Sequence, residues 1–326
     1  MPPPPTGGAG GPPAVPSHQP TSHSSLVTRH SSLPPPSRLP PWFRRPLPPA
    51  AGAAEVRRAL SACPGHRLHT VCEGAKCPNR AECWHDRAAA FLILGDHCTR
   101  DCRFCAIPHA TAPLPPPDPA EPAALADAAA ALGLRHIVVT SVTRDDLPDG
   151  GAAHFAATLR ALHERLPSAT TEVLIPDFRG DLDALQTVLD AHPDILNHNL
   201  ETTARLHPAV RPQASYTRSL AVLRAAAGRG ARTKSGLMLG LGETDDEILA
   251  TLRDLRSAGV THLTLGQYLA PTPSHHPVAR YLPPADFDRW RDTALSLGFS
   301  RVVSSPLARS SYHAGEHLAG PGTPLG

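Results

Sequence analysis

Six of the seven cysteines of this chain form two short groups, and their spacing suggests metal chemistry. The first group follows a C-x4-C-x5-C pattern and consists of Cys72, Cys77 and Cys83. The second follows a C-x3-C-x2-C pattern, just after an apolar stretch, and consists of Cys98, Cys102 and Cys105. Three thiolates leave one position of an iron–sulfur cluster open to a reactant. Two such triads predict two clusters with different tasks.

Two other uses of cysteine are alternatives to iron–sulfur clusters. Disulfides are typical of small secreted chains with an even cysteine count, whereas this chain has seven cysteines in 326 residues and no apolar signal segment. Structural zinc prefers four ligands in paired C-x2-C knuckles. Neither triad has that pairing, although a histidine could complete a zinc site, the candidates being His66, His69, His85 and His109. Cys63 stands alone, and we expect it to be a bystander.

The net charge and the hydropathy of the chain do not predict a nucleic acid or a membrane as a partner. The formal net charge is +2, which does not predict binding to nucleic acid or to a membrane surface. No apolar run has the length of a membrane span. Six reduced thiols and the lack of a signal segment predict a cytoplasmic protein.

The first fifty residues differ in composition from the rest of the chain. Sixteen of them are proline, and no acidic residue precedes Glu55. Such a segment cannot bury enough apolar surface to offset the entropy of ordering, so residues 1–50 are predicted to be disordered. A transit peptide remains an alternative, although dense proline opposes the amphipathic helix that it needs. We divide the remainder into an N-terminal extension (51–90) with the first cysteine triad, a central domain (91–300) and a C-terminal extension (301–326).

Between the two ends, apolar stretches alternate with helical ones. Strands are predicted at Phe91–Leu94, His136–Ser141, Glu172–Ile175, Ile195–Asn199, Thr233–Leu239 and His262–Leu265. Helices are predicted at Pro122–Leu132, Ala152–Leu166, Leu182–His192, Thr217–Gly228, Asp245–Ala258 and Asp286–Leu297. Expected helix-terminal residues are Asp245 and Asp286 as N-caps and Gly228, Gly259 and Gly298 after the C-caps. Six strand–helix units predict an α/β fold, a partial (β/α)6 barrel with a parallel sheet inside.

Polar residues follow several of these strands. In a parallel barrel the carboxyl ends of the strands meet at one edge, where chemistry is located. The second cysteine triad belongs to this edge, together with Thr140, Ser141, Arg144, Asp145, Asp146, Asp177, Asn197, His198, Asn199, Gln267 and Tyr268. Such residues also form ordinary turns. Their recurrence nevertheless predicts a shared cavity.

The motifs resemble one enzyme family closely. Cys98–Cys105, Cys-Thr-Arg-Asp-Cys-Arg-Phe-Cys, resembles the cluster loop of radical S-adenosylmethionine (SAM) enzymes. The run from Cys72 to Trp84 resembles the narrower lipoyl synthase family. So do five further stretches, at residues 140–147, 173–180, 197–202, 233–243 and 309–314. The resemblance extends from about Pro40 to about Glu316.

This resemblance implies a reaction. Electron transfer to the cluster of Cys98, Cys102 and Cys105 would cleave SAM to a 5′-deoxyadenosyl radical, which takes hydrogen from an octanoyl chain. The second cluster would donate its own sulfur, at C6 and C8, with one SAM consumed for each. The implied partners are octanoylated lipoyl-carrier domains, namely 2-oxoacid dehydrogenase E2 subunits and the glycine cleavage H protein. An electron donor such as flavodoxin or ferredoxin and an iron–sulfur carrier protein are also implied.

The resemblance also implies a ligand set for two 4Fe–4S clusters. The sulfur-donating cluster would be held by Cys72, Cys77, Cys83 and Ser311. Serine is a harder ligand than thiolate and suits a sulfide-rich cluster less well. Our hypothesis is that the bond to Ser311 is lost when the cluster is dismantled, so that one iron can leave.

Contacts to SAM and to the substrate are expected at further positions. Phe104 is expected near the adenine, and the polar groups of Thr140, Ser141, Glu172 and Lys234 are expected to hold the ribose and methionine parts. Arg144, Arg179 and His198 are expected to meet the carrier protein or the octanoyl-lysine.

Two alternative functions remain open. One is another radical SAM sulfur-inserting enzyme, acting on a biotin precursor or on tRNA, although this chain has no basic RNA-binding module. The other is a non-catalytic iron or zinc protein, in which loss of one cysteine would affect folding rather than turnover.

Overall fold

The computed structural model describes residues 1–3, 39–44, 51–61, 68–85 and 88–312. The chain divides into two units, Met1–Pro34 and Pro35–Gly326, and all described helices and strands belong to the second. The predicted disorder of residues 1–50 falls largely outside the described ranges, as does Cys63. A short 3-10 helix, η1 (Pro41–Phe43), is the first described element of the second unit, and the Phe43 ring meets the Tyr281 ring edge-on with 5.8 Å between centroids.

One eight-stranded sheet organises the second unit. Its order is β1 to β8 in sequence, and β1 is antiparallel to β2 while all later neighbours are parallel. Among the described strands β8 and β1 do not pair, so the sheet stays open as a partial barrel. The strands are β1 (His69–Thr70), β2 (Ala90–Ile93), β3 (His136–Ser141), β4 (Thr170–Leu174), β5 (Ile195–Asn197), β6 (Thr233–Leu239), β7 (His262–Gln267) and β8 (Arg301–Ser305).

The six predicted strands are confirmed as β2 to β7, with ends that differ by at most two residues. The prediction missed β1 and β8. β1 has only two residues, too few for a periodic signal. β8 is half-buried throughout and has two apolar residues, Val302 and Val303, so it lacks the apolar run of a central strand. It lies in the range that the sequence assigned to the C-terminal extension.

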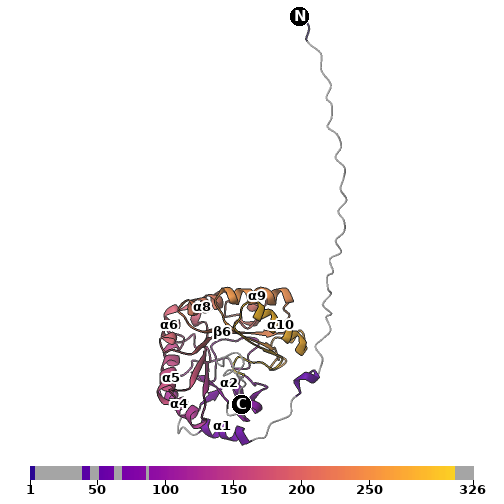
Figure 1. Cartoon of the computed structure of the whole chain (residues 1–326). Helices are drawn as coiled ribbons and strands as arrows, with labels where there is room; N and C mark the ends of the chain where they lie inside the picture. The colour runs from indigo at the N-terminus through magenta and orange to yellow at the C-terminus, as the bar shows by residue number, and fades with distance from the viewer. Residues whose placement is uncertain (4–38, 45–50, 62–67, 86–87, 313–326) are drawn as a thin grey trace. The chain divides into compact units, whose positions relative to one another are not determined.

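Helices surround the strands, as Figure 1 shows for α4, α5, α6, α8, α9 and α10. The long helices are α1 (Ala51–Ser61), α4 (Glu121–Ala131), α5 (Ala152–Arg165), α6 (Leu182–Leu189), α8 (Tyr216–Gly228), α9 (Asp245–Ser257) and α10 (Pro284–Ser296). The short ones are α2 (Val71–Gly74), α3 (Arg80–His85), η2 (Phe178–Gly180) and α7 (His207–Val210). The six predicted helices are therefore confirmed as α4, α5, α6, α8, α9 and α10.

Some predicted helix ends were wrong by a few residues. Thr244, not Asp245, is the N-cap of α9, where it forms a capping box with Glu247. Asp286 lies in the first turn of α10, whose N-cap is Pro283. Gly228 is the last residue of α8, and Gly230 supplies the left-handed turn beyond it with φ +85°. Gly259 and Gly298 follow their C-caps as predicted.

The core lies between the sheet and its outer helices. One apolar cluster joins β2–β4 to α4–α6, and a second joins β6 and β7 to α9 and α10. Burial of β2 and β7 along their whole lengths matches the near-continuous apolar runs of the sequence. These two clusters hold the strands whose ends carry the site residues, and a third, smaller cluster includes Tyr268.

Candidate functional site

The loop that carries the second triad is held by backbone hydrogen bonds on three sides. Cys98 N donates to Pro108 O (2.8 Å), and Thr99 N donates to Thr143 O in the loop after β3 (3.0 Å). Arg103 N donates to Val210 O at the end of α7 (2.9 Å). The three cysteines therefore lie on a backbone fixed at the carboxyl edge of the sheet.

The thiols of this loop have the surroundings of cluster ligands. Cys98 Sγ accepts hydrogen bonds from the backbone N–H of Arg100 (3.4 Å) and of Thr143 (3.3 Å). Hydrogen bonds to sulfur are one means by which proteins tune iron–sulfur clusters. Burial raises the pKa of Cys105 to about 12 and also raises the pKa of Cys102. These thiols are therefore protonated at neutral pH until a metal displaces the proton.

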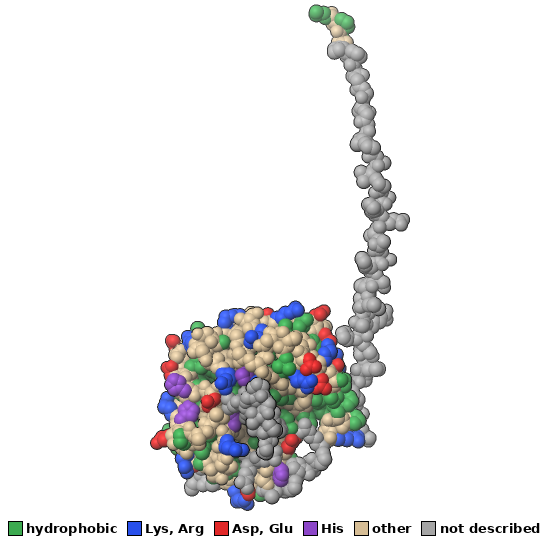
Figure 2. Space-filling model, in the orientation of Figure 1, with side chains coloured by type: hydrophobic (Ala, Val, Ile, Leu, Met, Phe, Trp, Pro, Cys, Tyr) green, Lys and Arg blue, Asp and Glu red, His purple; other side chains and the backbone are tan. Residues whose placement is uncertain are grey.

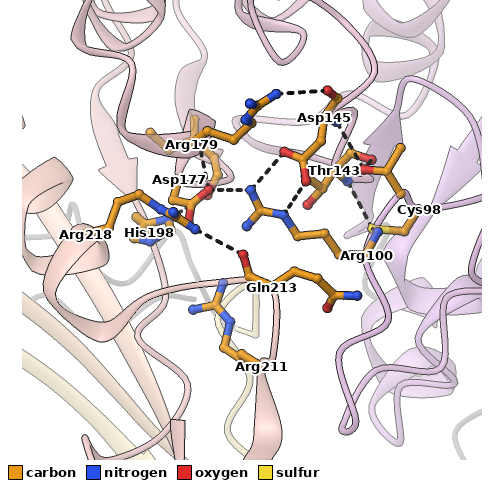
Figure 3. Close-up of polar contacts among 12 residues, drawn as sticks. Cys98, Arg100, Thr143, Asp145, Asp177, Arg179, His198, Arg211, Gln213 and Arg218 are labelled. Atoms are coloured by element: carbon orange, nitrogen blue, oxygen red, sulfur yellow. Dashed lines mark hydrogen bonds and ion pairs between the residues drawn. The ribbon is translucent and has the colours of Figure 1, made fainter. Parts of the chain in front are cut away.

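Arg100 ties the loop to two neighbouring strand ends (Figure 3). Its guanidinium donates to Asp145 Oδ2 at 2.6 Å and to Asp177 Oδ1 at 2.7 Å. Asp177 also accepts from Arg218 Nε at 2.7 Å and from the backbone N–H of Arg179 at 3.1 Å. Burial alone would raise the pKa of Asp177, but hydrogen bonding and charge from Arg100 outweigh it and hold the pKa well below its ordinary value. This network fixes the cluster loop against the ends of β3 and β4.

The first triad lies on two short helices and the turn between them, with Cys77 in the turn. Cys72 is buried in α2, and burial raises the pKa of its thiol. Cys83 lies in α3, where its N–H donates to Asn79 O at 2.9 Å. The Asn79 side chain donates to Leu307 O (2.7 Å), and Tyr312 OH donates to Glu82 Oε1 in α3 (2.9 Å). Residues 307 to 312 are thus bound to the elements that carry the triad.

Two adjoining cavities bring the triads together. The larger, of about 480 Å³, is lined by Cys72, Cys77, Cys98, Cys102, Cys105 and Ser311 among others. The second, of about 380 Å³, is lined by all four residues predicted to hold the sulfur-donating cluster, Cys72, Cys77, Cys83 and Ser311. Cysteines of both triads therefore line the larger cavity, and Ser311 lies in the wall of both cavities.

Some predicted SAM contacts line the larger cavity and others do not. Phe104, Thr140 and Ser141 line it, and the buried hydroxyl of Ser141 has no hydrogen-bond partner among the described residues. Glu172 and Lys234 do not line it, because they bond to each other inside the barrel, with both Nζ–Oε distances 3.0 Å. Their predicted contacts with ribose or methionine are therefore not supported. Glu172 lies in the middle of β4 and Lys234 is the second residue of β6, so both lie within the barrel rather than at its carboxyl edge.

Sequence reasoning gave no role to Glu201 and Arg211, which also line the larger cavity. Glu201 has a left-handed backbone, φ +69°, a strained conformation that is enriched at functional sites. Burial raises the pKa of its carboxyl, and Arg211 opposes that rise. Arg211 Nη1 donates to Asn199 O (3.0 Å), whereas its buried Nε has no partner among the described residues. The motif at 197–202 included Glu201, but its backbone conformation could not be read from sequence.

The residues expected to meet the carrier protein differ in placement. Arg144 is buried, and its Nη2 donates to Asp146 Oδ2 (2.8 Å) and to Pro115 O (2.8 Å). The expectation that it meets the carrier protein was therefore wrong. His198 is buried at the cavity wall, where burial and Arg211 lower its pKa to about 4. Arg179 is exposed and donates to Asp145 O at 3.4 Å.

The donor set fits iron–sulfur clusters better than the alternatives. The triad cysteines form no disulfide with one another. Among the described residues, no three His, Cys, Asp or Glu side chains converge closely enough to hold a single metal ion, as structural zinc would require. A four-iron cluster takes each thiolate on a different iron, so its ligands surround a cavity. Two cavities lined by thiols match that requirement.

Acidic and basic side chains are interspersed over the face in Figure 2. Within the described ranges, no helix is both long enough and apolar enough to span a membrane.

Comparisons with known proteins agree with this geometry. Residues 92–255 match the model of the radical SAM superfamily. The chain is 54% identical over 279 residues to lipoyl synthase of Rubrobacter xylanophilus, covering 85% of each chain. It is 52% identical over 280 residues to lipoyl synthase of Thermus thermophilus, covering 84% of this chain and 85% of the relative.

Among solved structures, Streptococcus suis SuiB bound to precursor peptide SuiA shares the fold, with TM-score 0.51 and 12% identity, over 72% of this chain and 52% of that one. At 12% identity this likeness shows a shared fold only. The identities of 54% and 52% to the two lipoyl synthases show membership of a family. The chain therefore belongs to the lipoyl synthase family, whose members are sulfur-inserting radical SAM enzymes that use 4Fe–4S clusters and SAM.

Proposed function

We propose that this enzyme inserts two sulfur atoms, at C6 and C8, into an octanoyl chain carried on a lysine of a lipoyl-carrier domain. The observation that carries the proposal is that cysteines of both triads line the larger cavity. Ser311 lies in the wall shared by both cavities, together with Cys72 and Cys77. An extended acyl chain in the larger cavity would thus reach both a hydrogen-abstracting centre and a sulfur source.

The cysteines divide between two clusters in this proposal. Cys98, Cys102 and Cys105 would hold the SAM-binding cluster, and Cys72, Cys77, Cys83 and Ser311 the sulfur-donating one. When bound, the first cluster supplies one-electron cleavage of SAM, giving a radical that can abstract hydrogen from an unactivated carbon, and the second supplies sulfur. The family resemblance and the lining of the two cavities support this division.

The side chains of the larger cavity would bind and orient the small molecules. Arg211, with a buried Nε lacking a partner among the described residues, is suited to the methionine carboxylate of SAM. Ser141 and Asn199 each offer a buried oxygen without a described partner, suited to hydroxyl or amino groups. Phe104 packs beside an apolar cluster that includes Tyr268 and would face the adenine. The roles of Arg211, Ser141 and Asn199 follow from their unsatisfied hydrogen-bonding groups at the cavity wall.

The macromolecular partners follow from the reaction. The substrates would be octanoylated carrier domains, such as 2-oxoacid dehydrogenase E2 subunits and the glycine cleavage H protein. Arg179 is exposed beside the network that holds the cluster loop, and in this proposal it would contact such a domain. A flavodoxin or ferredoxin would supply electrons, an iron–sulfur carrier protein would rebuild the cluster, and the cytoplasm is the compartment that suits them.

Mass spectrometry tests the proposal directly. Reconstituted enzyme is incubated anaerobically with reductant, SAM and an octanoyl-lysine peptide. We expect a product with two added sulfurs, and enzyme prepared with ³⁴S sulfide should pass the label to it. If deoxyadenosine forms while the peptide stays unchanged, the substrate assignment is wrong. If protein holding both clusters forms no deoxyadenosine, the radical chemistry itself is absent.

A further inference from the structure

The segment after β8, residues 306–312, lies along the inner face of the sheet; we call it the C-terminal strap. Gln267 N at the end of β7 donates to Pro306 O (3.2 Å), and Ala308 is 1% exposed. Two glycines make room for the strap. A Cβ at Gly266 would overlap the carbonyl oxygen of Ala308, and a Cβ at Gly236 would lie 3.3 Å from Ser310 Oγ. The strands are therefore shaped to accept this segment closely.

A buried lysine of the barrel holds the strap at Ser310. Lys234 Nζ donates to both carboxylate oxygens of Glu172 at 3.0 Å and to Ser310 O at 2.7 Å. An ammonium group has three protons to donate, so these acceptors use all of them. Both charged side chains are fully buried, and Asn197 Nδ2 also donates to Glu172 Oε1 (3.0 Å). The barrel interior and the strap thus share one hydrogen-bonded unit.

Two further side chains hold the strap near the same place. Asn199 Nδ2 donates to Ser310 Oγ at 2.6 Å, and Asn79 Nδ2 donates to Leu307 O at 2.7 Å. Ser310 is consequently fixed at both its carbonyl and its hydroxyl. The next residue is Ser311, whose direction is set by the backbone that leaves this anchored carbonyl.

A buried ion pair is a poor source of stability, because desolvation can cancel the attraction between its charges. Two apolar side chains in place of Lys234 and Glu172 could fill the same space. They could not donate a hydrogen bond to the strap, as Lys234 Nζ does to Ser310 O. We propose that Lys234 is a positioning residue, which fixes the strap so that Ser311 faces the cavity of the first triad before any cluster is present. This inference rests on the proposed role of Ser311 as a cluster ligand.

The test compares wild type with the double variant Lys234→Met/Glu172→Gln, which removes the strap contact without leaving a buried charge unpaired. The first readout is hydrogen exchange of the Ala308 and Tyr312 amides, which bond to Ser305 O and Arg309 O, in full-length protein with and without its clusters. Loss of a charge-assisted hydrogen bond should speed exchange of both amides by about tenfold. Unchanged exchange, or a strap unprotected in cluster-free wild type, would overturn the proposal.

The second readout is the rate at which a chelator removes iron from the reduced holoenzyme. We expect the double variant to lose the first iron of the sulfur-donating cluster about tenfold faster, with deoxyadenosine formation unchanged. A general loss of structure would instead accelerate exchange across the barrel and slow deoxyadenosine formation, which contradicts a positioning role. Equal iron release by both proteins contradicts it as well.

A second variant displaces the strap without altering charge. Gly266→Ala places a methyl group against Ala308 O and should reproduce both effects. The matched control is Gly228→Ala in α8, where a Cβ meets nothing within 4 Å and neither readout should change. If the wild-type enzyme forms no sulfur-containing peptide, the proposed function fails, whereas exchange and iron release still decide the role of Lys234. If product forms normally in all variants and both rates stay at wild-type values, only this inference fails.

Discussion

Arg100 and Asp177 are joined by a buried ion pair, with 2.7 Å between the guanidinium nitrogen Nη2 and Oδ1. Arg100 lies in the loop of the second triad, whereas Asp177 follows β4, so the pair connects a cluster loop to a strand end 77 residues away. Both side chains are almost fully removed from solvent, with relative exposures of 3% and 0%. The position of the triad therefore depends on a carboxylate that is no cluster ligand.

Asp177→Asn should destabilise the protein strongly. The substitution leaves the buried Arg100 charge with one carboxylate, and breaking a buried pair in this way costs about 3 to 5 kcal/mol. Urea unfolding of wild type and variant measures the difference. The control is Asp127→Asn, which removes an ion pair with Arg165 in which both side chains are more than half exposed, and it should cost less than about 0.5 kcal/mol. Similar costs for both variants would mean that the Arg100 network does not stabilise the fold.

Single cysteine substitutions should separate the two triads by function. Cys102→Ala removes a ligand of the SAM-binding cluster and should abolish deoxyadenosine formation. Cys83→Ala removes a ligand of the sulfur-donating cluster and should leave deoxyadenosine formation intact while sulfur insertion stops. Chromatography measures deoxyadenosine formation, mass spectrometry measures the sulfur-containing peptide, and iron analysis measures the cluster content. The reverse pattern would exchange the assigned roles of the triads.

Ser311→Cys should retain the sulfur-donating cluster and lose product. A thiolate binds iron more firmly than a serine oxygen, so the iron that must leave would be retained. We expect an unchanged iron content, an unchanged deoxyadenosine rate and at least about tenfold less of the peptide with two sulfurs. Ser310→Cys, one residue earlier and outside the predicted ligand set, is the comparison for a cysteine placed nearby. Full product from Ser311→Cys would contradict the idea that this bond must break.

The two cysteine triads could be predicted because thiol spacing along a chain is visible in sequence. Cysteines of both triads do line the larger cavity, and Ser311 lies in the wall of both cavities. The parallel sheet was also predictable, since buried central strands appear as apolar runs. β8 was not, because Val302 and Val303 are its only apolar residues and the strand is half-buried.

The roles of polar strand residues could not be predicted, because they depend on position along the barrel. Lys234 is the second residue of β6 and pairs in register with Asn197 and His262, so it lies inside the barrel rather than at its carboxyl edge. Its partner Glu172 lies mid-strand in β4. A sequence shows that a lysine interrupts an apolar strand, but the acceptor, Ser310 O, lies 76 residues away. Long-range contacts of this kind require the three-dimensional structure.

His198 should make stability depend on pH below neutrality. Its side chain is 1% exposed, its Nδ1 lies 2.9 Å from Ile175 O, and burial together with the Arg211 charge lowers its pKa from 6.5 to about 4. The charges that face it are Arg211, Asp177 and Arg100. Because the folded-state pKa is depressed, the unfolded chain binds the proton first as pH falls. The stability contribution of neutral His198 is therefore complete above about pH 6.5 and is lost progressively toward pH 4.

Unfolding of cluster-free protein in urea at pH 8 and pH 5.5 measures this contribution. A shift of this size makes wild type about 1 kcal/mol less stable at pH 5.5 through His198 alone. His198→Asn removes the titrating group, so the difference between the two pH values should shrink by about that amount even if the variant is less stable at both. An equal pH difference in variant and wild type would mean that His198 binds its proton alike in the folded and unfolded states, and that the buried imidazole is not held neutral by its surroundings.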